Sequence, residues 1–503
     1  MIARKSTLIM ANTITEALLA YVALFFIARY MGPRDFGIIG FAIGFVGLFG
    51  FLSNLGFNTA HVKRISEGKD LGTCIGTFLV TKLGLVSLMA AATIGAVFFW
   101  KLVIGRGFET PTHELAIFII LGYFIFERLS TIFQTTFTAE TKITKTYLPR
   151  FVATIARTGA IIFVAISGYG AIELAFAYVF GHVFLFITSL LLFRNYPIKR
   201  PSKECFHDYK IFAIPMIIVS SAALIMANLD KVLIQMFWSA EDVGYYFASA
   251  RICGFVVLAG ASIGELLFPM ISSYYSKKDT KSIKEMMYRS ERYISMITFP
   301  MVFGIVALAE PAINILLSAS FNPALPVFRI LPFYALINAL TIPYTSQLLG
   351  INKPKLVRNR ILIMVILNLV LNIILIPRDI KSLGLTLMGL SATGAAIATV
   401  VSYTAGYIQI RIVSMKLSRF KFNFRLLLHL FSASVMGIIL YLISINIAIE
   451  RWYELFAAGL LGLGIYFGIL YLFKEFTRND YNFMIDTLNI RKMWDHIVKE
   501  IKK

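Results

Sequence analysis

The sequence predicts an all-α protein that crosses a membrane many times, and three observations support this. Of its 503 residues, 58% are hydrophobic and 15% are charged, whereas soluble domains have roughly 45–50% and about 25%. The mean hydropathy of +0.77 is spread over repeated apolar runs of about 20 residues, each long enough to cross a hydrocarbon layer of roughly 30 Å. Lys and Arg gather between alternate runs. These features exclude a soluble enzyme.

The apolar runs define the expected helices. We predict fourteen transmembrane helices, approximately at 7–30, 36–57, 74–100, 114–137, 149–167, 172–193, 211–237, 243–270, 293–317, 326–349, 358–377, 386–410, 426–446 and 452–473. The first run is longer than the core of a signal peptide and no small-residue cleavage site follows it, so we expect it to remain in the mature protein.

The distribution of basic residues predicts the orientation. With a cytoplasmic N-terminus, 35 of the 48 Lys and Arg residues lie in or beside inside segments, six lie in outside loops and seven lie within spans. Because cytoplasmic loops carry the Lys/Arg excess, we predict a multi-pass cell membrane protein with both termini in the cytoplasm. The net charge of +21 then reflects topology and not nucleic-acid binding.

Familiar catalytic and metal-binding motifs are missing from the sequence. The three cysteines stand far apart, the six histidines form no H-x-x-x-H pair, and there is no G-x-x-x-x-G-K-[ST] loop. We therefore expect no metal site, no cofactor and no ATP hydrolysis. The chain is predicted to be a transporter and not an enzyme, driven by an ion gradient or by its substrate.

An internal repeat divides the chain. Asp35 and Gly37, after the first span, recur as Asp242 and Gly244 after the seventh, 207 residues later. We expect two parallel six-helix repeats, at 1–205 and 206–415, with the substrate site between them. Residues 416–473 add two helices. Residues 474–503 form a charged cytoplasmic tail, for which an amphipathic helix and a solvated segment are the alternatives.

Three segments carry a resemblance to a known family. They are the GPRDFG turn at residues 32–37, the segment from Asp230 through DVGYY to Arg251, and the GINKP connection at residues 350–354. With the span count, the chain resembles the multidrug/oligosaccharidyl-lipid/polysaccharide exporter superfamily, specifically its polysaccharide transporter branch of O-antigen flippase-like proteins. This resemblance implies two V-shaped lobes and alternating access, moving a polyprenyl- or dolichyl-linked glycan outward.

Ionisable residues deep in the first repeat predict a functional layer. Charges at the centre of a bilayer are costly unless they face protein or water, yet five lie about 12–15 Å above the inner boundary at the helical rise of 1.5 Å per residue. They are Glu16, Lys82, Glu127, Arg128 and Arg157. Asn54 extends the polar face of the second span. We expect Lys82, Arg128, Arg157 and Asn54 to bind substrate, with a structural Glu–Arg network as the alternative.

Other polar residues suggest further roles. Glu16 and Glu127 are the candidates for cation coupling. In the second repeat, Asp230 and Arg251 are level on adjacent helices and predict a structural ion pair. Asn338, Asn368 and Asn372 are candidate sugar-facing donors, with helix-packing hydrogen bonds as the alternative.

The leading functional hypothesis is a flippase that moves a (pyro)phosphate-linked oligosaccharide from the inner to the outer leaflet. Arg and Lys suit phosphate by charge and geometry. A cation-coupled multidrug antiporter on the same fold is the second hypothesis, and a membrane glycosyltransferase or polymerase is the third. The expected partners are the lipid-linked glycan, membrane lipids, H⁺ or Na⁺, and glycan-assembly enzymes, but no nucleic acid.

Overall fold

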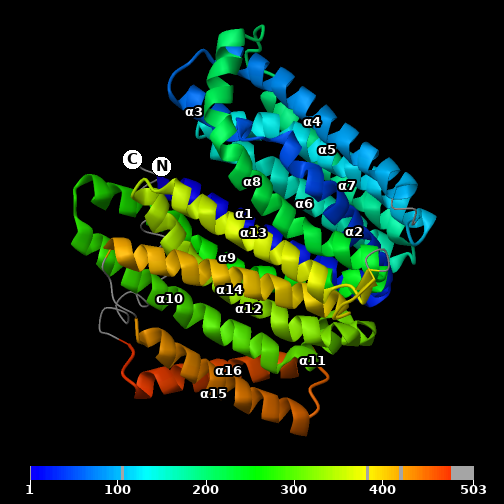
Figure 1. The fold of residues 1–503 in the computed structure, drawn as a ribbon, viewed down its shortest axis with the longest axis vertical. Helices are drawn as coiled ribbons and strands as arrows, with labels where there is room; N and C mark the ends of the chain where they lie inside the picture. The colour runs from blue at the N-terminus through cyan, green and yellow to red at the C-terminus, as the bar shows by residue number, and fades with distance from the viewer. Residues whose placement is uncertain (1, 104–106, 381–383, 419–422, 477–503) are drawn as a thin grey trace. The chain divides into compact units, whose positions relative to one another are not determined.

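The computed structural model describes residues 2–103, 107–380, 384–418 and 423–476. Almost all of them are helical, as the apolar runs predict (Figure 1). Eleven of the described helices are long and apolar enough to span a membrane, or twelve if one bent pair counts as a single span. The protein therefore has a polytopic, all-helical membrane fold. The tail beyond Phe476, with its expected amphipathic helix, lies outside the described residues.

The first compact unit comprises residues 1–244. Its helices are α1 (Ile2–Tyr30), α2 (Gly32–Phe49), the 3₁₀ turn η1 (Gly50–Ser53), α3 (Phe57–Ser66), α4 (Leu71–Leu102), α5 (Pro111–Ala139), α6 (Ile143–Ile166), α7 (Ala171–Phe193) and α8 (Lys203–Phe237). Within this unit α2 packs against α5 and α8, while α6 packs against α1 and α7. Helix α9 (Ala240–Ser276) begins in this unit.

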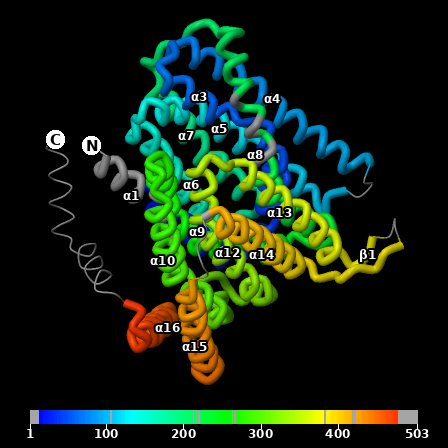
Figure 2. Tube along the Cα trace, turned by 60° about the vertical axis from the view of Figure 1, so that its left-hand side comes forward, coloured from blue at the N-terminus to red at the C-terminus, as the bar shows by residue number. Residues whose placement is uncertain are grey.

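The second compact unit runs from Tyr245 through the last described residue, Phe476. After α9 come α10 (Thr280–Ala307), α11 (Ala309–Ala312), the π turn η2 (Ile313–Leu317), η3 (Ala319–Ala324), α12 (Leu325–Gly350), α13 (Pro354–Leu375), β1 (Asp379–Ile380), β2 (Leu385–Thr386), α14 (Ser391–Ser418), α15 (Arg425–Asn446) and α16 (Trp452–Leu472). Figure 2 shows α13 and α14 running together to the β1–β2 hairpin.

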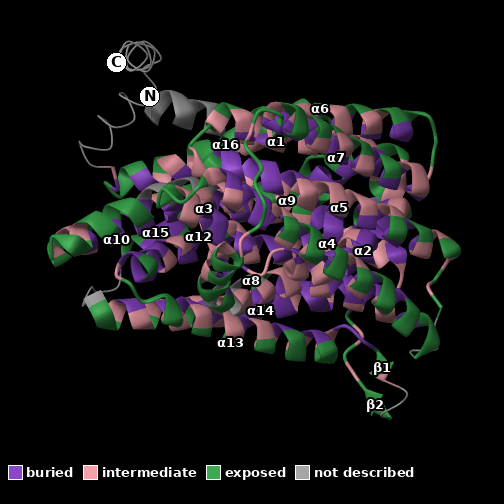
Figure 3. Ribbon diagram, turned by 90° about the horizontal axis from the view of Figure 1, so that it is seen from above, coloured by how far each residue is buried: buried purple, intermediate pink, exposed green. Residues whose placement is uncertain are grey.

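The pattern of buried and exposed residues fits a protein whose outer helices contact lipid. Only 28% of the apolar window of α13 is buried inside the protein, and exposed and intermediate residues follow its length (Figure 3). By contrast, 72% of the window of α2 is buried. Since exposed apolar side chains are stable in contact with lipid tails, α13 is a peripheral helix of its unit and α2 is a central one.

Two predicted spans are broken in the structure. The expected helix 36–57 ends early: η1 follows α2, and Leu55 and Gly56 have φ angles of +42° and +83° before α3 begins. The expectation of one continuous helix through residue 57 is therefore wrong, because two successive left-handed residues cannot continue an α-helix. The expected span 293–317 bends by 80° between α10 and α11.

The first turns of α2 and α9 make a reciprocal backbone contact. A Cβ atom built on Gly37 would lie 1.7 Å from the carbonyl oxygen of Ala240, and one on Gly244 would lie 2.0 Å from that of Pro33. Ala240 follows Pro33 by 207 residues, as Gly244 follows Gly37. Only glycine permits so close an approach of two backbone segments.

A buried carboxylate fixes the chain after α16. Glu475 is 3% exposed, and its Oε1 accepts a hydrogen bond from Nε of Arg292 at 2.5 Å and one from Nη1 of Arg425 at 3.1 Å. The Nε2 atom of His429 lies 3.4 Å from the same oxygen, and Nδ1 of His429 hydrogen-bonds to Ser295. Helices α10 and α15 therefore hold the end of α16 through one charge cluster.

The glycine contact predicts strongly coupled substitutions. Gly37→Ala and Gly244→Ala should each destabilise the protein by about 3 kcal/mol, since each forces a methyl group into a carbonyl oxygen. Thermal unfolding in detergent should show a double variant that loses at least about 1 kcal/mol less than the sum, because the first substitution already parts the turns. Gly84→Ala, whose Cβ would meet no atom within 4 Å, is the control. Additive losses would contradict this contact.

The Glu475 cluster predicts a pH-dependent stability. Burial raises the pKa of Glu475, but hydrogen bonds from His429 and Arg292 and the charges of Arg292 and Arg425 outweigh it and lower the pKa to about 2. A carboxyl group whose pKa is lower in the folded state stabilises the folded protein at pH values above its unfolded-state pKa of about 4.5. This stabilisation is lost as the pH falls toward 2.

The variant that tests this pH dependence is Glu475→Gln, which leaves the buried Arg292 without its charged partner. At pH 7 it should lose about 3–5 kcal/mol of unfolding free energy. The difference from the wild type should shrink between pH 4.5 and 2. Arg289→Ala, in an exposed pair with Glu285, should change little. A pH-independent difference would refute the role of the Glu475 charge.

Candidate functional site

The break after α2 places a backbone oxygen inside the first unit. Because η1 is a short 3₁₀ turn, its carbonyl groups are not all taken by the helix. The ammonium group of Lys82, on α4, donates a hydrogen bond to the carbonyl oxygen of Ser53 at 2.7 Å. Lys82 is fully buried, so its side chain does not reach toward a membrane surface. The hydrogen bond from Lys82 stabilises the break between α2 and α3.

Polar side chains from three helices contact successive small positions of α2 and η1. These positions are spaced three residues apart: Gly44, Gly47, Gly50 and Ser53. Lys231 and Asn228 of α8 pack onto the first two positions, with the Lys231 Cβ 3.0 Å from a Cβ built at Gly44. We call Lys231, Asn228, Arg128 and Lys82 the α2 polar row.

Arg128 is the accessible member of this row. Its side chain is 19% exposed, and its Nη2 lies 3.6 Å from a Cβ built at Gly50 and 3.6 Å from Oε2 of Glu127. Its guanidinium carbon lies 5.7 Å from the centre of the Phe124 ring. The Nε atom has no hydrogen-bond partner among the described residues. Arg128 therefore keeps a hydrogen-bond donor that the described residues do not use.

His182 joins the charged layer from α7. The charged groups of Glu127, Arg157 and Arg128 lie close enough to act electrostatically on the His182 ring. Its Nδ1 atom lies 3.1 Å from the carbonyl oxygen of Tyr178. Its ring lies 4.0 Å from that of Tyr123. Residues predicted to form one layer, Glu127, Arg128 and Arg157, therefore lie around a histidine that the sequence analysis did not select.

Arg157 reaches this layer from α6 by packing on a glycine. A Cβ built at Gly181 would lie 2.5 Å from that of Arg157. Within the part of the chain that the structure describes, the Arg157 guanidinium forms no hydrogen bond or ion pair. A half-buried guanidinium in this state is suited to an anionic ligand.

Glu16 and Asn54 each interact with a neighbour on their own segment. The Asn12 amide donates a hydrogen bond to Oε1 of Glu16 at 2.6 Å, as their spacing of four residues predicts. The side-chain oxygen of Asn54 accepts a hydrogen bond from the backbone N–H of Asn58 at 3.1 Å. Asn54 thus supports the start of α3 after the break.

In the second unit, the predicted asparagines occupy two environments. Asn368 and Asn372 are buried, with the Asn372 amide donating to Asn368 at 3.1 Å and the Asn368 amide donating to Thr399 at 3.4 Å. This geometry is that of a packing contact between α13 and α14. Asn338, on α12, is only partly buried.

Asp230 and Arg251 belong to different compact units. Asp230 is 4% exposed in α8, and the guanidinium carbon of Arg251 lies 4.8 Å from the centre of the Phe247 ring. The ion pair between them stays a prediction.

Three buried or partly buried groups of the site were missed from sequence alone: His182, Asn228 and Lys231. The available signal was the glycine spacing in α2, because small residues three or four apart mark close helix contacts in membranes. That spacing shows that large side chains can approach, but not which helix provides them.

Comparisons with known proteins agree with this fold. A family model described as polysaccharide biosynthesis protein matches residues 26–326. The probable low-salt glycan biosynthesis flippase Agl15 of Haloferax volcanii is 23% identical over 475 residues, covering 93% of this chain and 94% of that protein. The teichuronic acid biosynthesis protein TuaB of Bacillus subtilis is 25% identical over 125 residues, covering 25% of this chain and 26% of that protein.

Two solved structures share the architecture. The lipid II flippase MurJ, in an inward closed conformation, superposes with a TM-score of 0.74 at 15% identity, over 93% of this chain and 98% of that one. An inward-facing multidrug resistance transporter of the MATE family superposes with a TM-score of 0.64 at 15% identity, over 81% and 96%. The fold is thus one that flippases and transporters share, and the match over residues 26–326 shows that the chain belongs to the polysaccharide biosynthesis protein family.

Proposed function

We propose that the protein is a flippase that carries a polyprenyl- or dolichyl-(pyro)phosphate-linked oligosaccharide from the inner to the outer leaflet. The observation that carries this proposal is that Lys82 and Arg128 lie near Glu127, and that Arg128, Arg157 and Glu127 all lie near His182. The full-length similarity to the probable glycan biosynthesis flippase Agl15 supports it.

In this mechanism Arg128 and Arg157 bind the phosphate. Guanidinium groups form two parallel hydrogen bonds to phosphate oxygens, and both side chains have donors left over by the described residues. Lys82 acts indirectly, because its buried ammonium group holds the Ser53 carbonyl and so the shape of the break after α2. The prenyl chain stays in the bilayer, and no covalent bond changes.

The proposal includes a topology. Both termini are cytoplasmic, fourteen spans cross the membrane, and two six-helix repeats at residues 1–205 and 206–415 form lobes that alternate in access. The offset of 207 residues between Pro33 and Ala240 and between Gly37 and Gly244, in segments that contact each other, supports the internal repeat. The basic-residue asymmetry supports the orientation.

The phosphate role predicts loss of transport without loss of protein. Arg128→Ala and Arg157→Ala should each abolish flipping of a lipid-linked glycan in reconstituted vesicles, because each removes charge-assisted hydrogen bonds to the phosphate. Expression and thermal stability should stay close to the wild type. Arg289→Ala, which removes an exposed charge, should transport normally. Normal transport in both site variants would refute the phosphate role, and failure of both to fold would favour a structural network.

A cation-coupled multidrug antiporter is the second candidate. The observation that favours it is the environment of the Glu16 carboxylate, a group that can bind a cation. Among the described residues, the Glu16 carboxylate accepts a hydrogen bond from the Asn12 amide, whereas Glu127 lies beside Arg128. We propose Glu16 as the group that binds H⁺ or Na⁺ during transport, in either a flippase or an antiporter. Whether the protein transports a lipid-linked glycan or a cationic drug distinguishes the two functions.

The coupling role predicts a selective defect. Glu16→Gln should still bind the lipid-linked glycan but lose the response of transport to an imposed cation gradient, since the amide cannot exchange a proton or balance a sodium ion. Glu285→Gln, at an exposed site, is the control. Transport that ignores the gradient in the wild type would instead indicate a facilitated flippase, driven by consumption of the product.

A further inference from the structure

Two cysteines far apart in sequence meet where α4 and α8 begin. The Sγ atoms of Cys74 and Cys205 lie 3.7 Å apart, and both thiols are free. The sequence separation of 131 residues gave no reason to pair them. We propose that Cys74 and Cys205 form a redox-active dithiol that a peroxide oxidises to a disulfide.

Hydrogen bonds hold the N-terminal ends of α4 and α8 together beside the two cysteines. The Tyr209 hydroxyl, one turn after Cys205, donates a hydrogen bond to the carbonyl oxygen of Cys74 at 3.2 Å. Nδ1 of His61 lies 2.8 Å from the same hydroxyl, and its Nε2 lies 2.9 Å from the hydroxyl of Thr136. This buried network fixes the backbone at Cys74. Bond formation needs a sulfur–sulfur distance of about 2.05 Å, so side-chain rotation of the thiols is the main movement required.

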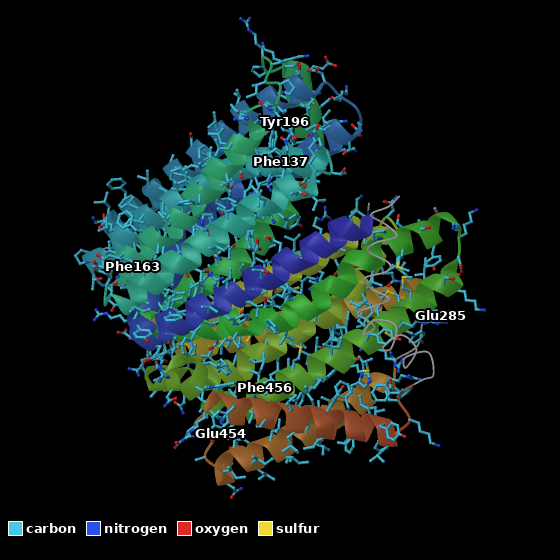
Figure 4. The ribbon with its side chains drawn as sticks, turned by 180° about the vertical axis from the view of Figure 1, so that it is seen from behind. Phe137, Phe163, Tyr196, Glu285, Glu454 and Phe456 are labelled. Carbon is cyan, nitrogen blue, oxygen red and sulfur yellow. The ribbon has the colours of Figure 1, made fainter. Side chains whose placement is uncertain are left out.

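The connection between α7 and α8 supports the same alignment. The backbone N–H of Lys199 donates to the Gly72 carbonyl at 3.1 Å, and that of Ser202 donates to the Thr77 hydroxyl at 3.0 Å. Tyr196 at the start of this connection lies against Phe137, with ring centres 5.5 Å apart (Figure 4). The segment that delivers Cys205 to Cys74 is therefore anchored along its length.

An oxidant can reach the pair. A cavity of about 150 Å³ opens beside it, lined by both cysteines and by Arg64, Lys69, Asp70 and Asp208 among others. Cys253 differs, since it is buried in α9 and is not among the residues that line this cavity. The chain thus provides an internal control thiol.

Both cysteines lie in the first turn of a helix, and exposure makes Cys205 the attacking sulfur, since Cys205 is partly exposed whereas Cys74 is buried. The position of Cys205 in α8 also favours the thiolate. It is the third residue of α8, where the Ser202 hydroxyl caps the helix and accepts a hydrogen bond from the Cys205 N–H at 3.5 Å. Thiolates are stabilised at helix N-termini. The hydrogen bond with Cys74 further lowers the pKa of Cys205. Cys205 lies before the apolar run of α8, on the side that we propose to be cytoplasmic.

The chemistry balances in two steps. The Cys205 thiolate attacks one oxygen of hydrogen peroxide, the O–O bond breaks, and the leaving hydroxide takes a proton to become water. This leaves a sulfenic acid. The Cys74 sulfur then attacks the Cys205 sulfur, the S–OH bond breaks, and the thiol proton leaves with the hydroxide as a second water. Two thiols have lost two electrons and the peroxide has gained them. A reducing dithiol reverses the change.

The test uses the full-length protein in detergent, treated with hydrogen peroxide and then denatured. Thiol counting should show a fall from three thiols to one, restored by dithiothreitol. Mass spectrometry should find the peptides of Cys74 and Cys205 linked. Cys253→Ser should fall from two thiols to none, while Cys74→Ser and Cys205→Ser should form no intramolecular link. Gel filtration before treatment verifies that each variant is folded, and Cys74→Ala replaces Cys74→Ser if that variant aggregates.

The proposal is overturned if peroxide leaves three thiols in the wild type, or if it oxidises Cys205 to sulfinic acid without linking Cys74. It is also overturned if Cys253 enters the link. None of these outcomes depends on transport, so the result is independent of the proposed flippase function.

Discussion

The close approach of other helices to the glycine face of α2 is the constraint on which the first unit depends. In a bilayer, helices gain little from burying apolar surface against one another, so packing and polar contacts must hold them together. Gly44 and Gly47 let α8 come near enough to place Asn228 and Lys231 against α2. In the first turns of α2 and α9, Gly37 and Gly244 allow one backbone to approach the other closely. Larger side chains at these positions would separate the helices and remove the contacts that the charged layer requires.

Hydropathy and charge asymmetry were sufficient to predict the fold class, because both are properties of runs of residues and need no knowledge of partners. They failed at residues 50–57, where an apolar run continues through a broken helix. A window of mean hydropathy cannot detect the left-handed φ angles of Leu55 and Gly56. The bend between α10 and α11 was missed for the same reason.

The candidate site was partly predictable. Depth along separate helices grouped Glu127, Arg128 and Arg157, and the structure has all three near His182, since residues at one depth in parallel or antiparallel spans have a chance to meet. Depth does not identify which helices are neighbours. His182, from α7, was therefore missed, although it lies within reach of the charges of those three residues. The Cys74–Cys205 pair was missed likewise, because the contact depends on how the connection before α8 folds along α4.

The sign of the charge in this layer bears on which ligand the protein transports. Lys82 and Arg128 have Glu127 as a charged neighbour, and Arg157 lies with Arg128 and Glu127 around His182, so three of these four charged side chains are basic and one is acidic. An excess of positive charge at this depth is costly in a low-dielectric environment. A bound phosphate or pyrophosphate would offset that excess, whereas a cationic drug would increase it. Differential affinity between two states is what drives a conformational change, and an anion that neutralises the layer can provide it. On electrostatic grounds the arrangement therefore favours an anionic lipid-linked substrate over a cationic one.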